Sequence, residues 1–331
     1  MQETYRIIGV ESSPYTVKVR AVMRFRRLPH VWLSRMPQYF EETEHVRPLL
    51  MPVVQFPDGT YRTDTTPIIL DLERLHPNSR SIVPTDLAAA FLSLLIEDMA
   101  DEWTMKAMFH YRWHYAEDAE WCANWLMYDS LPLAGREQVE EAARTIRERQ
   151  ISRMALVGCT PETKPVIETS FKRVTGHLEE VAEGGTLFLF GNRPSLADLA
   201  FYGQVKVMSV DPTPMAFLRK DRPYFYRWLD MVDDASGIEG NWTEAPGAPV
   251  KALLTVAGDT YLPFLAANEE ALKAGEETFS LELDGKPYTQ GVFKYQLRCL
   301  TTLREAWRDL PEDAREMLSA MIGPNADILN G

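Results

Sequence analysis

The order of periodic segments in the first 80 residues is the feature that most constrains how this chain can fold. Residues 5–10 form a short β-branched run that ends at a Glu-Ser-Ser-Pro segment, which is typical of a buried strand followed by the start of a helix. Residues 17–27 place apolar side chains on one side and basic side chains on the other, which predicts an amphipathic helix. Residues 30–34 are a second strand candidate.

A hairpin and a helix complete this first unit. Residues 52–56 and 60–63 flank an Asp-Gly pair at 58–59, and such a pair between two apolar runs is a strong signal for a tight turn. A Thr-Thr-Pro segment at 65–67 then opens a helix, because proline suits the first turn of a helix. The predicted order is therefore strand, helix, strand, irregular link, hairpin and helix.

Helical periodicity dominates the middle of the chain. The stretch 77–84 is interpreted as a linker, and one long helix is predicted after it over residues 88–115. Further helices are predicted at 136–156, 163–183, 195–209 and 222–235.

The last part of the chain mixes helix and strand signals. A Gly- and Pro-rich stretch at 237–247 is a second linker candidate. After it we expect a helix over 249–274, a β-hairpin with an Asp-Gly turn at 284–285, and two closing helices. The chain is therefore expected to divide into a first domain over 1–80, a helical domain over 85–238 and an extension over 245–331.

Length and charge exclude several classes of protein. The chain has 331 residues, which is enough for about two domains with sizeable cores. Its net charge of -13 argues against nucleic acid or an anionic membrane as the main partner, because both are bound through basic patches. Basic side chains do cluster in residues 18–27, so an anionic ligand near the N-terminus is compatible with this sequence.

Cysteine usage and the lack of targeting signals indicate a cytoplasmic protein. Cys122, Cys159 and Cys299 are far apart and odd in number, which fits a reducing compartment better than a disulfide framework. The first residues do not have the pattern of a signal peptide, and no stretch approaches transmembrane length. His110 and His114 have a metal-capable spacing, but there is no HExxH motif, so we predict no metal site.

Ser12 and Ser13 precede Pro14 at the junction between the first predicted strand and helix. Backbone N–H groups and the helix dipole at such an N-terminus favour an anion. A serine before proline is also an ordinary N-cap, so this tripeptide alone predicts a cap more readily than a functional site.

Two further patterns follow in the same unit. Met51-Pro52 immediately precedes the predicted hairpin, and Asp64-Thr65 immediately precedes the next helix. Taken alone, an Asp-Thr pair is a plain helix cap, and a bond before proline is usually trans.

In this order and spacing, the patterns resemble those of the glutathione transferase superfamily. The first looks like the strand-to-helix junction of serine-type members, such as the zeta and theta classes and some bacterial β-etherases. Ser195 and Asp198 are similar to the family's capping box before a buried helix, which serves folding. The resemblance covers residues 5–235. It implies an α/β thioredoxin-like domain and then an all-α domain, here with a mixed α+β extension.

The resemblance implies that Ser13, or alternatively Ser12, donates a hydrogen bond to the thiolate of glutathione. A hydrogen bond to a charged group contributes roughly 1.5–3 kcal/mol. Such a contribution lowers a thiol pKa by about one to two units, which brings the thiol of glutathione to about physiological pH.

The other patterns would hold the rest of glutathione. In the family the bond before this proline is cis, so Met51-Pro52 would present the Met51 backbone to the cysteinyl segment, as an added strand would. Asp64 would bind the γ-glutamyl ammonium, and Thr65 would bind the γ-glutamyl carboxylate at a helix N-terminus.

The sequence also departs from the family pattern. Met51 replaces the usual valine, and the glycine that normally precedes it is lost, so the glycine end of glutathione has only weak candidates in His45 and Arg47. For the second substrate, a small apolar electrophile, the aromatic candidates are Tyr15 and Tyr111.

Three functions are therefore compared. The first is a glutathione transferase, a homodimer in which activated glutathione attacks an electrophile whose identity the sequence does not give. The second is a non-catalytic protein of this fold that binds apolar ligands or proteins, which the extension and the altered loop favour. The third is an omega-type redox enzyme, which the lack of cysteine at residues 11–16 disfavours. The extension is expected to pack on the helical domain.

Overall fold

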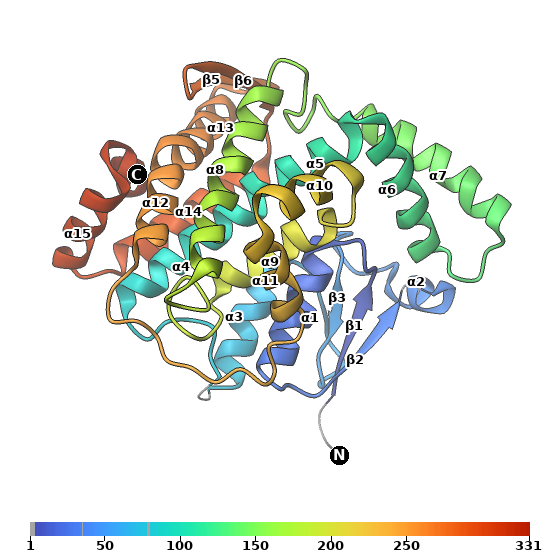
Figure 1. Ribbon diagram of the computed structural model, residues 1–331, viewed down its shortest axis with the longest axis horizontal. Helices are drawn as coiled ribbons and strands as arrows, with labels where there is room; N and C mark the ends of the chain where they lie inside the picture. Colours follow the sequence, from blue (N-terminus) through green and yellow to red (C-terminus); the bar gives the residue numbers. More distant parts are fainter. Residues whose placement is uncertain (1–3, 35, 78–79) are drawn as a thin grey trace.

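The computed structural model describes residues 4–34, 36–77 and 80–331. A small sheet with its own helices forms the N-terminal part, and a larger helical body lies against it (Figure 1). The last third of the helical body, drawn in orange and red, is the C-terminal extension, which packs beside α4 and α8 (Figure 1).

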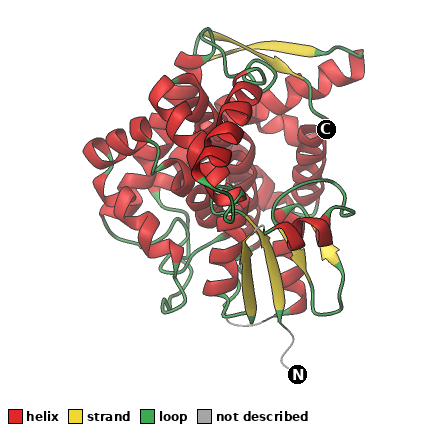
Figure 2. Cartoon of the chain, turned by 90° about the vertical axis from the view of Figure 1, so that its right-hand side faces the viewer, coloured by secondary structure: helices red, strands yellow, loops and turns green. Residues whose placement is uncertain are grey.

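The N-terminal sheet has four strands in the order β2-β1-β3-β4, seen at the bottom of Figure 2. The strands are β1 (Tyr5–Gly9), β2 (His30–Ser34), β3 (Val53–Gln55) and β4 (Tyr61–Arg62). β1 is parallel to β2 and antiparallel to β3, and β3 is antiparallel to β4. The three helices of this part are α1 (Pro14–Phe25), α2 (Pro37–Thr43) and α3 (Thr65–Leu75).

Alternation along the strands places apolar side chains on both faces of the sheet. Ile7 and Val54 join the main core together with Phe25 of α1 and Leu72 of α3. Ile8 and its neighbours belong to a separate small cluster that includes Tyr39 of α2. Because neighbouring residues of a strand point to opposite faces, this pattern puts α1 and α3 on one face of the sheet and α2 on the other.

The helical body begins with a long helix that is interrupted once. α4 (Leu87–Met99) continues through a π-helical turn, η1 (Ala100–Thr104), into α5 (Met105–His114). The remaining helices of the body are α6 (Ala116–Ser130), α7 (Arg136–Ile151), α8 (Lys164–Glu183), α9 (Leu196–Met208), α10 (Pro212–Asp221) and α11 (Pro223–Asp233).

The predicted capping box is present at the start of α9, the most buried of these helices. The Asp198 backbone N–H donates to Ser195 Oγ at 3.4 Å, and the Ser195 N–H donates back to Asp198 Oδ2 at 2.8 Å. The Leu189 N–H also donates to Asp198 Oδ1 at 3.0 Å, so one carboxylate stabilises both the helix start and the loop before it.

The extension is folded and shares the core of the helical body. Its elements are α12 (Ala248–Val256), η2 (Ala257–Tyr261), α13 (Leu262–Ala274), β5 (Thr278–Leu283), β6 (Lys286–Gly291), α14 (Lys294–Arg308), α15 (Glu312–Ile322) and η3 (Pro324–Asn330). The ring of Trp307 lies 5.2 Å from that of Phe91 in α4, and the ring of Phe264 lies 5.2 Å from that of Trp103 in η1. The expectation that the extension packs on the helical domain is confirmed.

The predicted elements agree with the structure at most positions. The four strands, the helices at 65–75 and 195–208, and the hairpin at 278–291 are found where they were expected. At the tip of that hairpin Asp284 has φ 51° and Gly285 has φ 68°, the left-handed pair that a two-residue hairpin turn requires. None of the helices in the described residues is long and apolar enough to cross a membrane.

Three helices were not predicted. α2 was expected to be an irregular link, and α6 and α10 were not assigned at all. α2 has only seven residues, and Phe40 on it is 46% exposed, so it carries no clear apolar stripe. The residues of α6 mix aromatic and acidic side chains without a strong period, because this helix packs mainly against α7 and leaves much of its surface open.

Candidate active site

Sheet topology brings the three sequence patterns to one end of the sheet. Val53 at the start of β3 is opposite Ile8, so the residues just before β3 lie beside the loop that follows β1. Arg62 at the end of β4 is opposite Val54, so the chain leaves β4 at this same end. Ser12-Ser13, Met51-Pro52 and Asp64-Thr65 occupy these three connections, so the pairing of the strands explains why they lie at the same end of the sheet.

Ser13 is the N-cap of α1 and keeps a free hydroxyl proton. Its Oγ accepts a hydrogen bond from the Thr16 backbone N–H at 3.3 Å, and Pro14 fills the first helical position. Among the described residues, none accepts the Ser13 hydroxyl proton. This side chain can therefore cap α1 and donate to an anion at the same time.

Ser12 is engaged elsewhere. Its backbone N–H and its hydroxyl both donate to Asp129 Oδ2, each at 3.0 Å, and its side chain is buried. Asp129 lies in the last turn of α6, and burial raises the pKa of its carboxyl group. The pair ties the hairpin of α6 and α7 to the loop before α1.

The bond between Met51 and Pro52 is cis, as the resemblance implied. Within the described ranges, no hydrogen bond involves the backbone N–H or C=O of Met51. Leu49 and Leu50 just before it are exposed by 71% and 43%. The Met51 backbone is therefore open to pairing with an extended ligand.

Asp64 has an unusual backbone and unexpected partners. Its φ is 74°, which a non-glycine residue adopts only at a cost, and it forms no side-chain cap on α3. The carboxylate instead accepts from the Tyr295 hydroxyl at 3.1 Å and from Arg298 Nη1 at 3.3 Å, both on α14 of the extension. Burial raises the pKa of Asp64, and these two partners oppose that rise. The neighbouring Thr65 is buried at the start of α3.

A network of buried charged side chains lies next to the candidate site. Lys18 of α1 donates to Glu97 Oε1 at 2.5 Å and to Asp101 Oδ2 at 2.7 Å, and its side chain is fully buried. Burial alone would lower the pKa of Lys18, but the two carboxylates outweigh it and raise that pKa. The Thr66 hydroxyl of α3 donates to the same Glu97 oxygen at 2.5 Å, so the network joins α1, α3 and α4.

The two aromatic candidates are both enclosed. The Tyr15 hydroxyl donates to the Asp101 carbonyl in the π-helical turn at 3.0 Å, and burial raises its pKa well above the usual value. Tyr111 is 3% exposed and lies between the rings of Tyr115 and Phe171, so in this structure it belongs to the helical core. His45 contacts the Tyr61 ring edge-on, and Arg47 donates to the Glu44 carbonyl at 2.5 Å.

An apolar trough begins at Met51. A cavity of about 270 Å³ is lined by Met51, Leu50 and Phe40. Phe40 also lines a second cavity of about 460 Å³, which lies between α2 and the tip of the α6–α7 hairpin and includes Leu131 and Leu133. Phe40 lines both cavities, so the two cavities are adjacent. We call the two cavities together the apolar trough.

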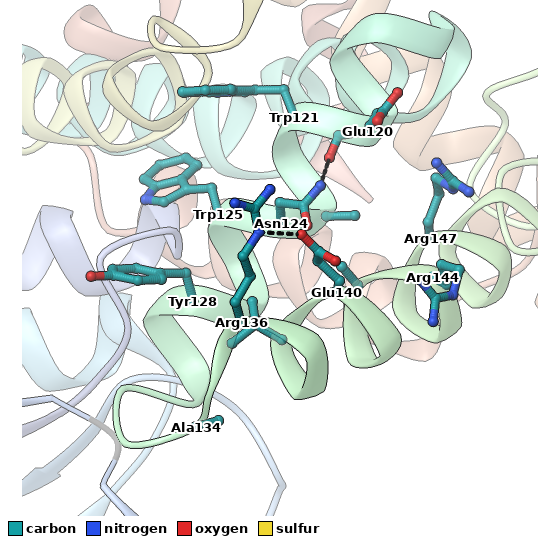
Figure 3. Close-up of a pocket in the computed structure, with 13 residues that line it drawn as sticks. Glu120, Trp121, Asn124, Trp125, Tyr128, Ala134, Arg136, Glu140, Arg144 and Arg147 are labelled. Carbon is teal, nitrogen blue, oxygen red and sulfur yellow. Dashed lines mark hydrogen bonds and ion pairs between the residues drawn. The ribbon is translucent and has the colours of Figure 1, made fainter.

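An aromatic groove between α6 and α7 adjoins the apolar trough and is drawn in Figure 3. Ala134 lines both the second cavity and this groove of about 920 Å³. Trp121, Trp125 and Tyr128 come from α6, and Arg136, Arg144 and Arg147 come from α7 (Figure 3). Arg136 pairs with Glu140 at 2.7 Å, so part of the positive charge of the groove is already neutralised.

Sequence reasoning missed the contributions of distant segments. Asp129, Tyr295 and Arg298 reach the site over separations of 117, 231 and 234 residues. No local motif marks them, because an exposed Tyr and Arg on a helix usually face solvent. Among the residues that the structure describes, no group of three or more His, Cys, Asp or Glu side chains is arranged to hold a metal ion.

A thioredoxin-like α/β unit followed by a largely helical body is the architecture of the glutathione transferase fold. A model of the glutathione S-transferase N-terminal domain matches residues 7–80, and a model of the glutathione S-transferase C-terminal domain matches residues 135–230. These two ranges together span just over half of the chain. The chain therefore belongs to the glutathione S-transferase superfamily and is a glutathione transferase-like enzyme.

Solved structures with a similar fold are distant in sequence. The β-etherase LigF from Sphingobium is 17% identical over 76% of this chain and 98% of its own, with a TM-score of 0.49. A glutathione S-transferase from Methylobacterium radiotolerans in complex with glutathione sulfonate is 19% identical over 74% of this chain and 99% of its own, with a TM-score of 0.40. One from Methylobacillus flagellatus with glutathione bound is 18% identical over 70% and 98%, with a TM-score of 0.40. No curated protein matches the sequence.

Proposed function

We propose that this protein activates the thiol of glutathione with Ser13 for attack on an apolar electrophile. The observation that carries this proposal is the uncommitted hydroxyl proton of Ser13 at the N-terminus of α1, beside the cis bond at Met51-Pro52. Ser12, the alternative donor, already gives its hydroxyl proton to Asp129.

The proposed mechanism has one proton step and one substitution step. The thiol of bound glutathione loses its proton to solvent, and the thiolate accepts a hydrogen bond from Ser13 at the helix N-terminus. The sulfur then forms a bond to an electrophilic carbon, and the bond from that carbon to its leaving group breaks. The protein contributes by stabilising the thiolate and by holding the two reactants together.

The remaining groups would position glutathione. The Met51 backbone would pair with the cysteinyl segment, Asp64 would bind the γ-glutamyl ammonium, and the start of α3 at Thr65 would bind the γ-glutamyl carboxylate. The unpaired backbone of Met51 and the capless first turn of α3 support these roles.

For the electrophile we propose the apolar trough, in place of a pocket at Tyr111. The lining of the trough between α2 and the hairpin tip is almost wholly apolar, with Phe40, Met127 and Leu133 among its residues. Apolar cavities with a few polar groups at one end are the usual binding places for small molecules. The Tyr15 hydroxyl donates to the Asp101 carbonyl. We therefore propose that Tyr15 supports the loop before α1 and does not contact the electrophile.

The test compares Ser13→Ala, Ser13→Asp and Ser12→Ala. Glutathione binding would be measured by calorimetry, the thiol pKa of bound glutathione by ultraviolet absorbance, and turnover with a chlorodinitrobenzene as the electrophile. Ser13→Ala should raise the pKa of the bound thiol by about one to two units and lower turnover at pH 7 by roughly 10- to 100-fold. Glutathione affinity should change little.

The other two variants separate catalysis from capping. Asp is a good N-cap but cannot donate to a thiolate, so Ser13→Asp should keep the stability of α1 and still lose turnover. Ser12→Ala should lower stability with a smaller effect on the thiol pKa. Wild-type turnover in Ser13→Ala, or no glutathione binding by the wild-type protein, would contradict the proposal. The second result would favour a non-catalytic binding protein.

A homodimer in the cytoplasm is also proposed, because the chain belongs to a family in which dimers are expected. Light scattering on the purified full chain measures the assembly directly.

A further inference from the structure

Helix α14 of the extension places two side chains on the carboxylate of Asp64. Tyr295 and Arg298 are three residues apart, so they lie on the same face of the helix. The Tyr295 hydroxyl donates to Asp64 Oδ1 and Arg298 Nη1 donates to Asp64 Oδ2, so each carboxylate oxygen receives one hydrogen bond. This face of α14 therefore covers the start of α3.

Most of the donor capacity of Arg298 is unused. Its side chain is 62% exposed, and the ion pair that it forms within the described residues is the one with Asp64 at 3.3 Å. A guanidinium group carries five N–H donors in a rigid fork. In the ranges that the structure describes, the other N–H groups of Arg298 have no hydrogen-bond partner. They can bind an anion without breaking the contact with Asp64.

The first turn of α3 has free donors at the same place. Asp64 occupies the N-cap position but does not cap the helix, because its φ of 74° turns the side chain towards α14. Pro67 has no N–H, and within the described part of the chain the backbone N–H groups of Thr65 and Thr66 form no hydrogen bond. The N–H donors at the start of α3 and the guanidinium group of Arg298 on α14 thus both lie beside Asp64.

The cavity next to these donors is lined by acidic side chains. It has a volume of about 70 Å³ and is lined by Asp64, Glu97 and Asp98 as well as by Tyr295 and Arg298. Lys18, which pairs with Glu97, also pairs with Asp101. Acidic side chains therefore outnumber basic ones in the described lining of the cavity, and the exposed guanidinium group of Arg298, with its unused N–H groups, lies at the mouth.

We infer that α14 completes the γ-glutamyl subsite, with Arg298 binding the α-carboxylate of glutathione while Asp64 binds the α-ammonium. This inference rests on the proposed function, because it assigns the ligand of Asp64. Tyr295 is a positioning residue that holds the Asp64 carboxylate in place. A zwitterion matches an acidic cavity with a cationic mouth, whereas a simple cation or a simple anion satisfies only one half of it.

The test uses three peptides and two arginines of the same helix. The peptides are glutathione, γ-aminobutyryl-cysteinylglycine, which lacks the α-carboxylate, and glutaryl-cysteinylglycine, which lacks the α-ammonium. Their dissociation constants would be measured by calorimetry for the wild type, Arg298→Ala and Arg308→Ala. Arg308 is exposed at the far end of α14, and within the part of the chain that the structure describes it donates only to the Arg304 carbonyl, so it is a matched control.

Arg298→Ala should weaken binding of glutathione and of glutaryl-cysteinylglycine by about tenfold. It should leave binding of γ-aminobutyryl-cysteinylglycine unchanged within about twofold, because that peptide offers no α-carboxylate. Arg298→Lys keeps the positive charge but not the forked arrangement of N–H donors, so it should lose less affinity for glutathione than Arg298→Ala does. Arg308→Ala should bind all three peptides like the wild type.

The outcomes separate this inference from the proposed function. If the wild type binds glutathione and Arg298→Ala binds it equally well or more tightly, Arg298 does not bind the carboxylate, and only this inference fails. If the variant loses the same affinity for all three peptides, Arg298 acts through the fold, and the inference also fails. If the wild type does not bind glutathione at all, both proposals fail.

Discussion

At the scale of single residues, Lys18 lies at the centre of the buried charge network beside the candidate site. Its ammonium lies between Glu97 and Asp101, all three side chains are buried, and Thr66 donates to the same Glu97 oxygen. Burial raises the pKa of Glu97 to about 7, against the effect of Lys18. Removal of one partner from a buried ion pair costs far more than the pair itself contributes, because the other charge is left uncompensated.

Lys18→Met should therefore lower the free energy of unfolding by roughly 3–5 kcal/mol at pH 8. Lys172→Met, at an exposed position of α8, is the control and should stay within about 0.5 kcal/mol of the wild type. Urea unfolding measures both. A wild-type midpoint for Lys18→Met would show that the network does not support the fold.

The loss in Lys18→Met should also depend on pH. Without Lys18 the folded-state pKa of Glu97 lies still further above its unfolded value, so the folded state binds a proton more readily than the unfolded chain. The variant should regain stability as the pH falls from 8 towards 5, and Lys18→Met/Glu97→Gln should not show this gain. Urea midpoints measured across this range distinguish the two.

Sequence motifs identify only those candidate site residues whose surroundings are set by their neighbours in the sequence. Ser13 and the Asp64-Thr65 pair could be proposed as candidates because each stands at a strand-to-helix junction, where neighbouring residues in the sequence fix its surroundings. Asp129 and Arg298 could not be found, because their roles come from contacts over more than 100 residues. Tyr111 was selected for its aromatic ring, but the position of α5 in the core decides its environment.

At the scale of elements, the approach of α9 to α1 positions Ser13. A Cβ at Gly203 of α9 would lie 2.6 Å from the Pro14 carbonyl oxygen and 3.0 Å from Lys18 Cβ. Only glycine therefore lets α9 pass this close to the first turn of α1. A glycine inside a helix otherwise costs about 1 kcal/mol relative to alanine, so close packing is the reason for its presence here.

Gly203→Ala should lower the free energy of unfolding by roughly 1–3 kcal/mol, because the backbone carbonyl it meets cannot move aside alone. The displacement of α1 should also weaken glutathione binding. Gly176→Ala in α8 is the control, since its Cβ would meet only the end of the Arg222 side chain at 3.4 Å. Thermal unfolding and calorimetry of the pair check the prediction. Equal stability of both variants would mean that α9 can shift without cost.

Helices with a strong hydrophobic periodicity could be predicted from the sequence, whereas helices with a weak periodicity could not. The helix at Thr65–Leu75 carries a clear apolar stripe and the helix at Leu196–Met208 carries a capping box, so both were found. The long helix at 87–114 was predicted as regular, but η1 widens it at Ala100–Thr104, where the Asp101 carbonyl accepts from Tyr15. A π-helical turn is set by such tertiary contacts, which the sequence pattern does not contain.

At the scale of the whole molecule, the extension and the rest of the chain form one hydrophobic core. Phe264, Leu300 and Trp307 belong to the same buried cluster as Phe91 and Trp103. The segment around 237–247 that connects the two parts is largely exposed. The expected boundaries at 238 and 245 stay predictions, and the buried cluster contains residues from both sides of them.

A specific protease site inserted after Glu244 tests this continuity. Cleavage there should give two fragments that remain together in size-exclusion chromatography and keep wild-type glutathione affinity, because the shared core holds α14 on α3. Separation of the fragments without denaturant would show that the extension is an independent domain. The uncut protein with the same insertion is the control.

The contact between Arg298 and Asp64 also has a consequence for synthesis. The two residues are 234 positions apart, and a ribosome adds about 5–20 residues per second, so roughly 10–50 s pass between them. During that interval Asp64 has been synthesised and its two partners on α14 have not. On the proposed assignment, the γ-glutamyl subsite is completed only after α14 has left the ribosome.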